Sequence, residues 1–194
     1  PFSTVTFWFQ AAFVDGSTRS SAFYTFRYDD NRFPWQQLSE GGLTLHWYDG
    51  DAAFGQSALD AARAGVGVIG GLLALQSAEP LDIFLYSNPD DLQGALYLGG
   101  REWVGGHADP ALGAALVAIA PGDAQGIEMQ TEIPHEVAHV LLYRDLGAGY
   151  AGLPAWLSEG LASMVEGYPN PDYANALETA RAGGSLVPFV ELCD

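Results

Sequence analysis

Residues 135–139 read HEVAH, and residues 156–162 read WLSEGLA. Histidines four positions apart lie on the same face of a helix, so the imidazoles of His135 and His139 can reach one metal ion. The second motif offers the Glu159 carboxylate from a separate element of the chain. Two histidines and one carboxylate, with a fourth position left open, are the ligand set of many catalytic zinc sites.

The chemistry expected of this set is hydrolysis. Glu136 lies beside both histidines, where its carboxylate can hold a zinc-bound water molecule and accept its proton. The alternative is a helix that carries two histidines and binds no metal. Two observations disfavour it: the chain has only four histidines, and Glu159 stands in a largely apolar segment, where a carboxylate needs a partner such as a cation. The sequence therefore predicts a zinc metallopeptidase with Glu136 as general base.

Together the two motifs resemble those of the gluzincin zinc metallopeptidases, and within them the peptidase MA-like family. Nineteen residues (140 to 158) separate His139 from Glu159, a gap similar to that of thermolysin-like peptidases, whereas the WLSEGLA segment is nearer to the aminopeptidase branch. The resemblance extends from about Leu43 to Glu166. It implies one Zn²⁺ per chain, with His135, His139 and Glu159 as ligands and Glu136 as general base.

The resemblance also implies a side-chain donor for the developing oxyanion, a tyrosine or histidine placed after the third ligand. We favour Tyr168 because it follows the Glu159 segment; the other nearby candidates are Tyr143, Tyr150 and Tyr173. The aminopeptidase branch carries a G-x-M-E-N segment that binds the amino terminus of the substrate, and this sequence has no match to it. This absence disfavours an aminopeptidase and leaves an endopeptidase, or a peptidase of unassigned specificity, acting on polypeptides.

Four other polar residues are candidates for supporting or structural roles. A ligand imidazole usually donates its second N–H to a nearby acceptor, and Ser163, one turn past Glu159, is preferred over Asp145 for this role. Ser163 is interpreted equally well as a small residue that allows close helix packing. His46 and His107 are interpreted as structural histidines outside the ligand set.

Hydrophobic periodicity and turn residues predict an α+β fold: a zincin-like domain with a small mixed or mostly antiparallel sheet over helices, preceded by a β-hairpin. Strands are expected at 43–48, 81–86, 102–105 and 114–120, and helices at 56–78, from 88, at 131–147, at 154–167 and at 172–182. Ser57 and Thr131 are the expected N-caps of the first and third helices, and Pro134 is placed in the first turn of the zinc helix. The resemblance assigns 114–120 to an edge strand that pairs with an extended substrate.

Residues 1–42 are expected to form a separate unit, a hairpin that turns at Asp15-Gly16 followed by a linker from Asp29 to Gly42. The aromatic side chains of the hairpin need a partner. That partner is either the catalytic domain or a preceding β-rich domain of which the hairpin is a remnant. Residues 43–194 are assigned to the zincin-like peptidase domain. Gluzincin domains usually continue after the third ligand into a longer helical lobe that closes the cleft, and only 35 residues (160 to 194) follow Glu159. The resemblance therefore implies a domain truncated at its C-terminus, which bears on turnover more than on zinc binding.

The composition excludes several classes of partner. The formal net charge is −17, and all seven cationic residues are arginines, so electrostatics disfavour nucleic acid and anionic membranes. A membrane span is not expected because no run of 18 apolar residues occurs. The single cysteine, Cys193, forms no intramolecular disulfide and does not identify the compartment. The chain begins at Pro1 without a signal peptide, so we expect a processed or excised form. The resemblance to the peptidase MA-like family implies a bacterial protein located outside the cytoplasm.

Two other functions stay open. A zinc-stabilised or degenerate peptidase-like domain could bind a polypeptide without cleaving it. The intact Glu136 disfavours this function, because a structural zinc site needs no such carboxylate and usually closes its fourth position. The same zinc constellation can also polarise a carbonyl group that is not a peptide, and the sequence does not exclude such a substrate.

Overall fold

A computed structural model describes residues 2–73, 80–96, 106–109, 113–168, 170–188 and 191–192. The strands are β1 (Ser3–Phe7), β2 (Gln10–Ala12), β3 (Thr18–Ser20), β4 (Tyr24–Tyr28), β5 (Gln36–Glu40), β6 (Leu43–Trp47), β7 (Leu81–Tyr86), β8 (Gly106–Asp109) and β9 (Ala114–Ala118). The helices are α1 (Ala52–Leu73), α2 (Pro89–Leu96), α3 (Gln125–Leu146), the 3-10 helix η1 (Gly147–Gly152), α4 (Ala155–Met164) and α5 (Pro171–Gly183). Helices and small sheets confirm the predicted α+β class.

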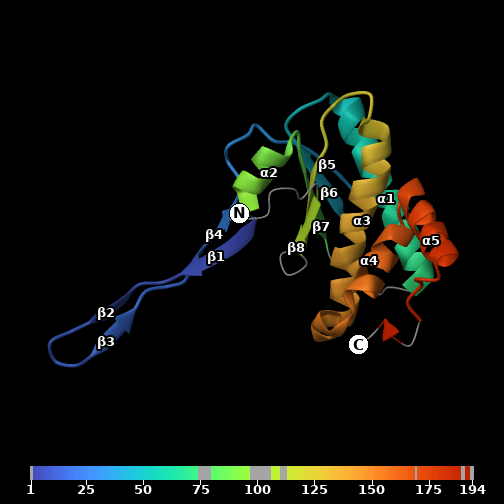
Figure 1. The fold of residues 1–194 in the computed structure, drawn as a ribbon. Coiled ribbons are helices and arrows are strands. Elements are labelled where there is room, and N and C mark those ends of the chain that lie inside the picture. Colours follow the sequence, from blue (N-terminus) through green and yellow to red (C-terminus); the bar gives the residue numbers. More distant parts are fainter. Residues whose placement is uncertain are drawn as a thin grey trace.

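The centre of the molecule is a five-stranded sheet in the order β5-β6-β7-β9-β8 (Figure 1). The two inner pairings, β6 with β7 and β7 with β9, are parallel, and the two outer pairings are antiparallel. Of the two sheet types that the sequence left open, the mixed one is therefore present. Parallel strands need cover on both faces, which explains why β7 has the almost continuously apolar sequence Leu81–Tyr86.

Each face of the sheet has its own hydrophobic cluster. Alternate residues such as Leu45, Ile83 and Val117 are buried against α1 and α3. The residues between them, such as Phe84 and Leu116, are buried against α2 on the other face. The thicker layer of helices therefore lies on the face that carries α3, the helix with the HEVAH motif. Among the described residues, no helix combines the length and apolar character needed to cross a bilayer.

Both long helices begin earlier than the sequence predicted. Helix α1 starts at Ala52, where the carboxylate of Asp51 accepts a hydrogen bond from the N–H of Phe54 at 2.9 Å. Ser57 is not its N-cap, because the Ser57 hydroxyl donates to the carbonyl of Ala53 within the helix. Helix α3 starts at Gln125, and Thr131 likewise bonds a carbonyl inside the helix. Serine and threonine hydroxyls serve both purposes, so the local sequence did not distinguish a cap from a helix interior.

Pro134 lies inside α3 and not in its first turn as predicted. Proline has no N–H, so it leaves the carbonyl four residues earlier, that of Gln130, without its helical partner. The N–H of Gly167 donates to this carbonyl at 2.7 Å. On another side, α1 passes so close that a Cβ atom at Gly65 would lie 2.9 Å from Cα of Pro134. The proline is thus accommodated by two tertiary contacts.

Two strand predictions need correction. Residues 114–118 form β9, which lies between β7 and β8, so this segment is not the edge of the sheet. The edge strand beside it is β8; the strand expected at 102–105 lies outside the described residues. At the other edge, Gln36–Glu40 pairs with β6 as β5, although the sequence analysis placed it in a linker. The division of the chain into domains at residue 42 stays a prediction.

The N-terminal hairpin is confirmed. Strands β1 and β4 pair in antiparallel register, and β2 and β3 continue the pairing to a turn in which Gly16 has φ of 82°. This ribbon extends away from the rest of the molecule (Figure 1). Contacts with the body lie at its base, where Phe2 stacks on Phe84 at 3.8 Å and Arg27 bonds Asp82 at 2.9 Å.

Candidate metal centre

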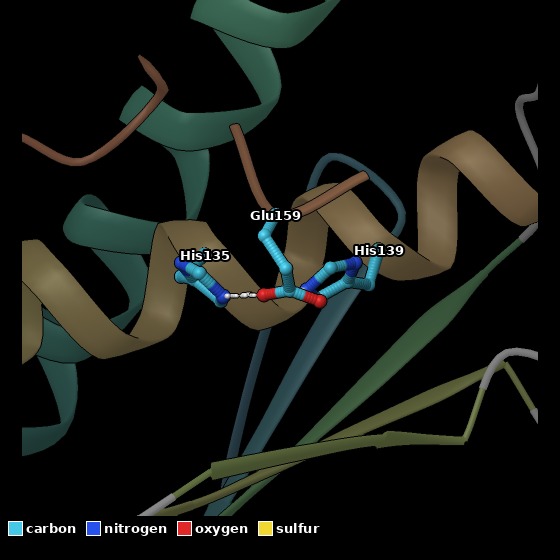
Figure 2. Close-up of side chains that lie close together, drawn as sticks. All are labelled: His135, His139 and Glu159. Carbon is cyan, nitrogen blue, oxygen red and sulfur yellow. Dashed lines mark hydrogen bonds and ion pairs between the residues drawn. The ribbon is translucent and has the colours of Figure 1, made fainter. Parts of the chain in front are cut away.

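Three side chains from two helices converge at one point. Figure 2 shows His135 and His139 projecting from α3 toward Glu159, which reaches down from α4. The Nε2 atoms of the two histidines are 3.2 Å apart, and the Glu159 carboxylate oxygen lies 3.3 Å from the first and 3.5 Å from the second. The three residues that the sequence predicted to lie together therefore do so in the structure.

These separations fit a zinc ion. Donor atoms arranged as a tetrahedron around zinc at about 2.0–2.1 Å stand about 3.3–3.4 Å from one another. The three observed distances lie within about 0.2 Å of that spacing. Nitrogen and carboxylate oxygen are also the donors that zinc accepts. Burial lowers the pKa of His139, which favours the neutral imidazole that binds metals, against the opposing charge of Glu159.

Each histidine is held by a second partner at its outer nitrogen. Nδ1 of His135 lies 2.9 Å from the carboxylate of Glu166, and Nδ1 of His139 lies 3.0 Å from the hydroxyl of Tyr150. If each Nδ1 carries the proton and donates it to these oxygens, both Nε2 lone pairs point to the shared site. The side chain of Glu166 is only 5% exposed, so its carboxylate is shielded from water.

The fold holds Glu166 in place through the unusual proline of α3. Helix α4 ends at Met164, and the chain then turns at Val165. Glu166 is followed by Gly167, whose N–H bonds the Gln130 carbonyl that Pro134 leaves free. A Cβ atom at Gly167 would lie 3.3 Å from the Gln130 side chain, which is tight contact. The proline and the glycine together anchor the segment that carries the carboxylate to His135.

Glu136 lies on α3 and faces β8 at the edge of the sheet. Its residue surface is 8% exposed, and its carboxylate accepts a hydrogen bond from the backbone N–H of Ala108 in β8. A Cβ atom at Gly106 would lie 2.8 Å from Cγ of Glu136, so the strand approaches this closely only because residue 106 is glycine. Burial raises the pKa of Glu136 to about 7, with the charge of His135 opposing and those of Glu132 and Glu159 adding to it. A carboxyl group with such a pKa can exchange a proton near neutrality.

The profile of the peptidase MA superfamily matches residues 61–193. The match covers more than half of the chain, including both motifs. The chain belongs to the peptidase MA superfamily. No curated protein matches it. Membership confirms the resemblance drawn from the HEVAH and WLSEGLA motifs and identifies a metallopeptidase-like domain, in which the cluster of His135, His139 and Glu159 could hold a metal ion.

The geometry of the site bears on two further roles, the oxyanion donor and the acceptors for the Nδ1 atoms of the two histidines. Among the candidate tyrosines, Tyr150 contacts His139, whereas Tyr168 is 51% exposed; the oxyanion role of Tyr168 stays a prediction. Burial, Glu159 and Glu136 raise the pKa of Tyr150, so its phenol stays protonated. Ser163 is not the acceptor for His135 or His139, because Glu166 and Tyr150 occupy the two Nδ1 positions.

The remaining histidines lie as expected or outside the described side chains. His46 bonds Asp82 at 3.0 Å and stacks on Phe84, so it is structural, as predicted. The backbone of His107 belongs to β8, and its side chain lies outside the described part of the structure. The sequence analysis considered Ser163 and Asp145 as acceptors and missed Glu166, which follows α4 and bonds His135. A buried-looking carboxylate between Val165 and Gly167 was the available signal.

Proposed function

We propose that this chain is a zinc-dependent endopeptidase in which His135, His139 and Glu159 hold the metal and Glu136 is the general base. The observation that carries the proposal is the near-tetrahedral spacing of three donor atoms beside a buried carboxylate. When bound, zinc would polarise water and the substrate carbonyl. The superfamily match supports the same chemistry.

The roles of the protein side chains follow from their positions. Glu136 accepts a proton from the attacking water and returns it to the leaving amine, so one group serves both halves of the reaction. The Ala108 N–H fixes the Glu136 carboxylate, and β8 shields it from bulk water. Glu166 and Tyr150 orient the two imidazoles. Tyr168 remains the proposed donor to the oxyanion.

An extended peptide has a natural place beside Glu136. Within the described residues β8 pairs with another strand, β9, on one side only. On its other side, the N–H of Ala108 donates to the carboxylate of Glu136. Backbone groups of a substrate could add to this edge as an extra strand, a common mode of peptide recognition. The substrate strand that the sequence analysis assigned to 114–120 is thus moved to β8. We retain a location outside the cytoplasm and a bacterial source as part of the proposal.

Cleavage that depends on the metal tests this function directly. Zinc-loaded protein mixed with an unfolded protein substrate should generate new amino termini, identified by mass spectrometry. A chelator should suppress cleavage while the far-ultraviolet circular dichroism stays largely unchanged, because the site sits on helices that pack in their own hydrophobic core. Unfolding on chelation, with no cleavage at one zinc per chain, would contradict the proposal and favour the zinc-stabilised binding module.

The contact between Glu166 and His135 gives a second prediction. Replacing Glu166 by Ala removes the acceptor for Nδ1 of His135, and we expect zinc to bind about 10- to 100-fold more weakly. Glu166→Gln keeps an acceptor oxygen without the charge, so its zinc affinity should lie between that of the original protein and that of Glu166→Ala. Competition with a chromogenic chelator measures the dissociation constants. Ser163→Ala on the preceding helix is the matched control, and an equal loss there would refute the specific role of Glu166.

A further inference from the structure

Glu132 lies on the same face of α3 as the residues of the candidate metal centre. It precedes His135 by three positions and Glu136 by four, and residues three or four apart are neighbours on the surface of a helix. It therefore stands one turn, about 5.4 Å, before Glu136 along the helix axis. Ile133 and Val137 are fully buried in the core, whereas Glu132 is only half-buried. Its side chain thus belongs to the open side of the helix, beside the candidate metal centre.

The carboxylate of Glu132 has no cation beside it. Among the described residues, we find no hydrogen bond and no ion pair to Glu132, whereas Glu159 and Glu166 each lie against a histidine and Glu136 accepts a backbone N–H. Burial raises the pKa of Glu132, with the charge of His135 opposing and that of Glu166 adding to the shift. A partly buried carboxylate without a counter-ion is costly unless a ligand supplies the cation.

The course of a bound peptide brings one of its side chains to Glu132. Strand β8 packs against α3, and the two elements run in roughly the same direction (Figure 1). A peptide that adds to the free edge of β8 therefore lies along α3 and passes Glu136, whose carboxylate accepts the Ala108 N–H. The residue on one side of the scissile bond is then carried toward the N-terminal end of α3, where Glu132 lies. Lysine and arginine have stems of three or four methylene groups, long enough to span one helical turn.

We propose that the peptidase selects substrates with a lysine or arginine next to the cleaved bond, and that Glu132 binds this cationic side chain. The inference rests on the proposed function and names its substrate class. A carboxylate forms charge-assisted hydrogen bonds with ammonium and guanidinium groups, and such a pair is stronger in a partly desolvated cleft than in water. The net charge of −17 also attracts cationic polypeptides, but it does not distinguish one position of the substrate from another. That distinction is the role of Glu132.

Mapping the cleaved bonds in unfolded protein substrates tests the selection. We expect lysine and arginine to be enriched at one position beside these bonds. For two peptides that differ only in lysine or norleucine at that position, kcat/KM should be about 10- to 100-fold higher with lysine, the range expected for a hydrogen bond to a charged group. Glu132→Gln keeps the size of the side chain and should abolish the preference. Glu132→Lys should transfer it to aspartate and glutamate.

The control variant separates Glu132 from the overall charge of the protein. Glu178→Gln makes the same change of net charge at an exposed residue of α5, and the preference for lysine should survive there. An equal loss of preference in both variants would refute the local role of Glu132. Cleavage should also survive acetylation of the peptide amino terminus. If acetylation abolishes it, the bound cation is the α-amino group of the substrate, and the assignment to a side chain is wrong.

Binding measured without turnover separates this inference from the proposed function. In zinc-loaded Glu136→Gln protein, fluorescence anisotropy of labelled peptides should show about 10- to 100-fold tighter binding of the lysine peptide than of the norleucine peptide. Adding Glu132→Gln should remove the difference. If the original protein cleaves neither peptide and the difference in binding persists, the peptidase proposal fails while the assignment of Glu132 stands. Equal binding of the two peptides would overturn that assignment, whether or not cleavage occurs.

Discussion

Replacing Glu136 by Gln should abolish peptide hydrolysis and leave zinc binding intact. General acid–base catalysis contributes about 10²- to 10⁴-fold to a rate, and the amide can neither accept the proton of water nor deliver it to the leaving amine. Gln has the same shape as Glu, and its carbonyl oxygen can still accept the N–H of Ala108, so the approach of β8 should not change. Steady-state cleavage of a fluorogenic peptide measures kcat, and elemental analysis measures zinc per chain.

The control for this substitution lies on the same helix. Glu128→Gln makes the same change of charge at an exposed position two turns before Glu136, and we expect kcat to stay close to that of the unsubstituted protein. Turnover in the Glu136→Gln protein near the original rate would remove Glu136 from the mechanism. Loss of zinc in that variant would instead mean that Glu136 takes part in binding the metal.

The sequence predicted those parts of the fold that depend on local patterns. Strand β7 begins and ends at the predicted residues because Leu81–Tyr86 is an apolar run bounded by turn residues. The start of α2 was predicted from Asn88 and Pro89, and the structure shows the Asn88 side chain capping the N–H of Asp91 at 2.8 Å. Two of the candidate metal ligands, His135 and His139, were predictable in the same way, because residues i and i+4 of a helix lie on one face.

The errors arose where distant parts of the chain decide the local structure. Pro134 suggested a helix start, but a proline inside a helix is tolerated when another group bonds the freed carbonyl, and Gly167 is 33 residues away from it. The order of β9 and β8 in the sheet is equally non-local, since the sequences of two neighbouring strands do not show which strand lies at the edge. Glu166 was missed for the same reason: its partner His135 is 31 residues away in the sequence, on α3.

Removing the carboxylate of Glu159 should have the second large effect, this time on metal affinity. Zinc binding to protein sites with four ligands amounts to roughly 10–16 kcal/mol, so one ligand accounts for about 2.5–4 kcal/mol, or on the order of 10²- to 10³-fold in the dissociation constant. We therefore expect Glu159→Ala to weaken zinc binding by that factor. Competition with a chromogenic chelator at pH 7 measures it.

The exposure of Glu159 separates this effect from misfolding. Its side chain is 59% exposed, so its removal should change the unfolding free energy of the metal-free protein by less than about 0.5 kcal/mol. Zinc stabilises a folded protein in proportion to the logarithm of its concentration over the dissociation constant, so micromolar zinc should raise the Tm of the original protein and much less that of the variant. Glu178→Ala removes a similarly exposed carboxylate on α5, and this variant should respond to zinc as the original protein does. Equal zinc responses in all three proteins would show that Glu159 is not a ligand, because a carboxylate that binds the ion cannot be removed without lowering the free energy that the ion adds to the fold.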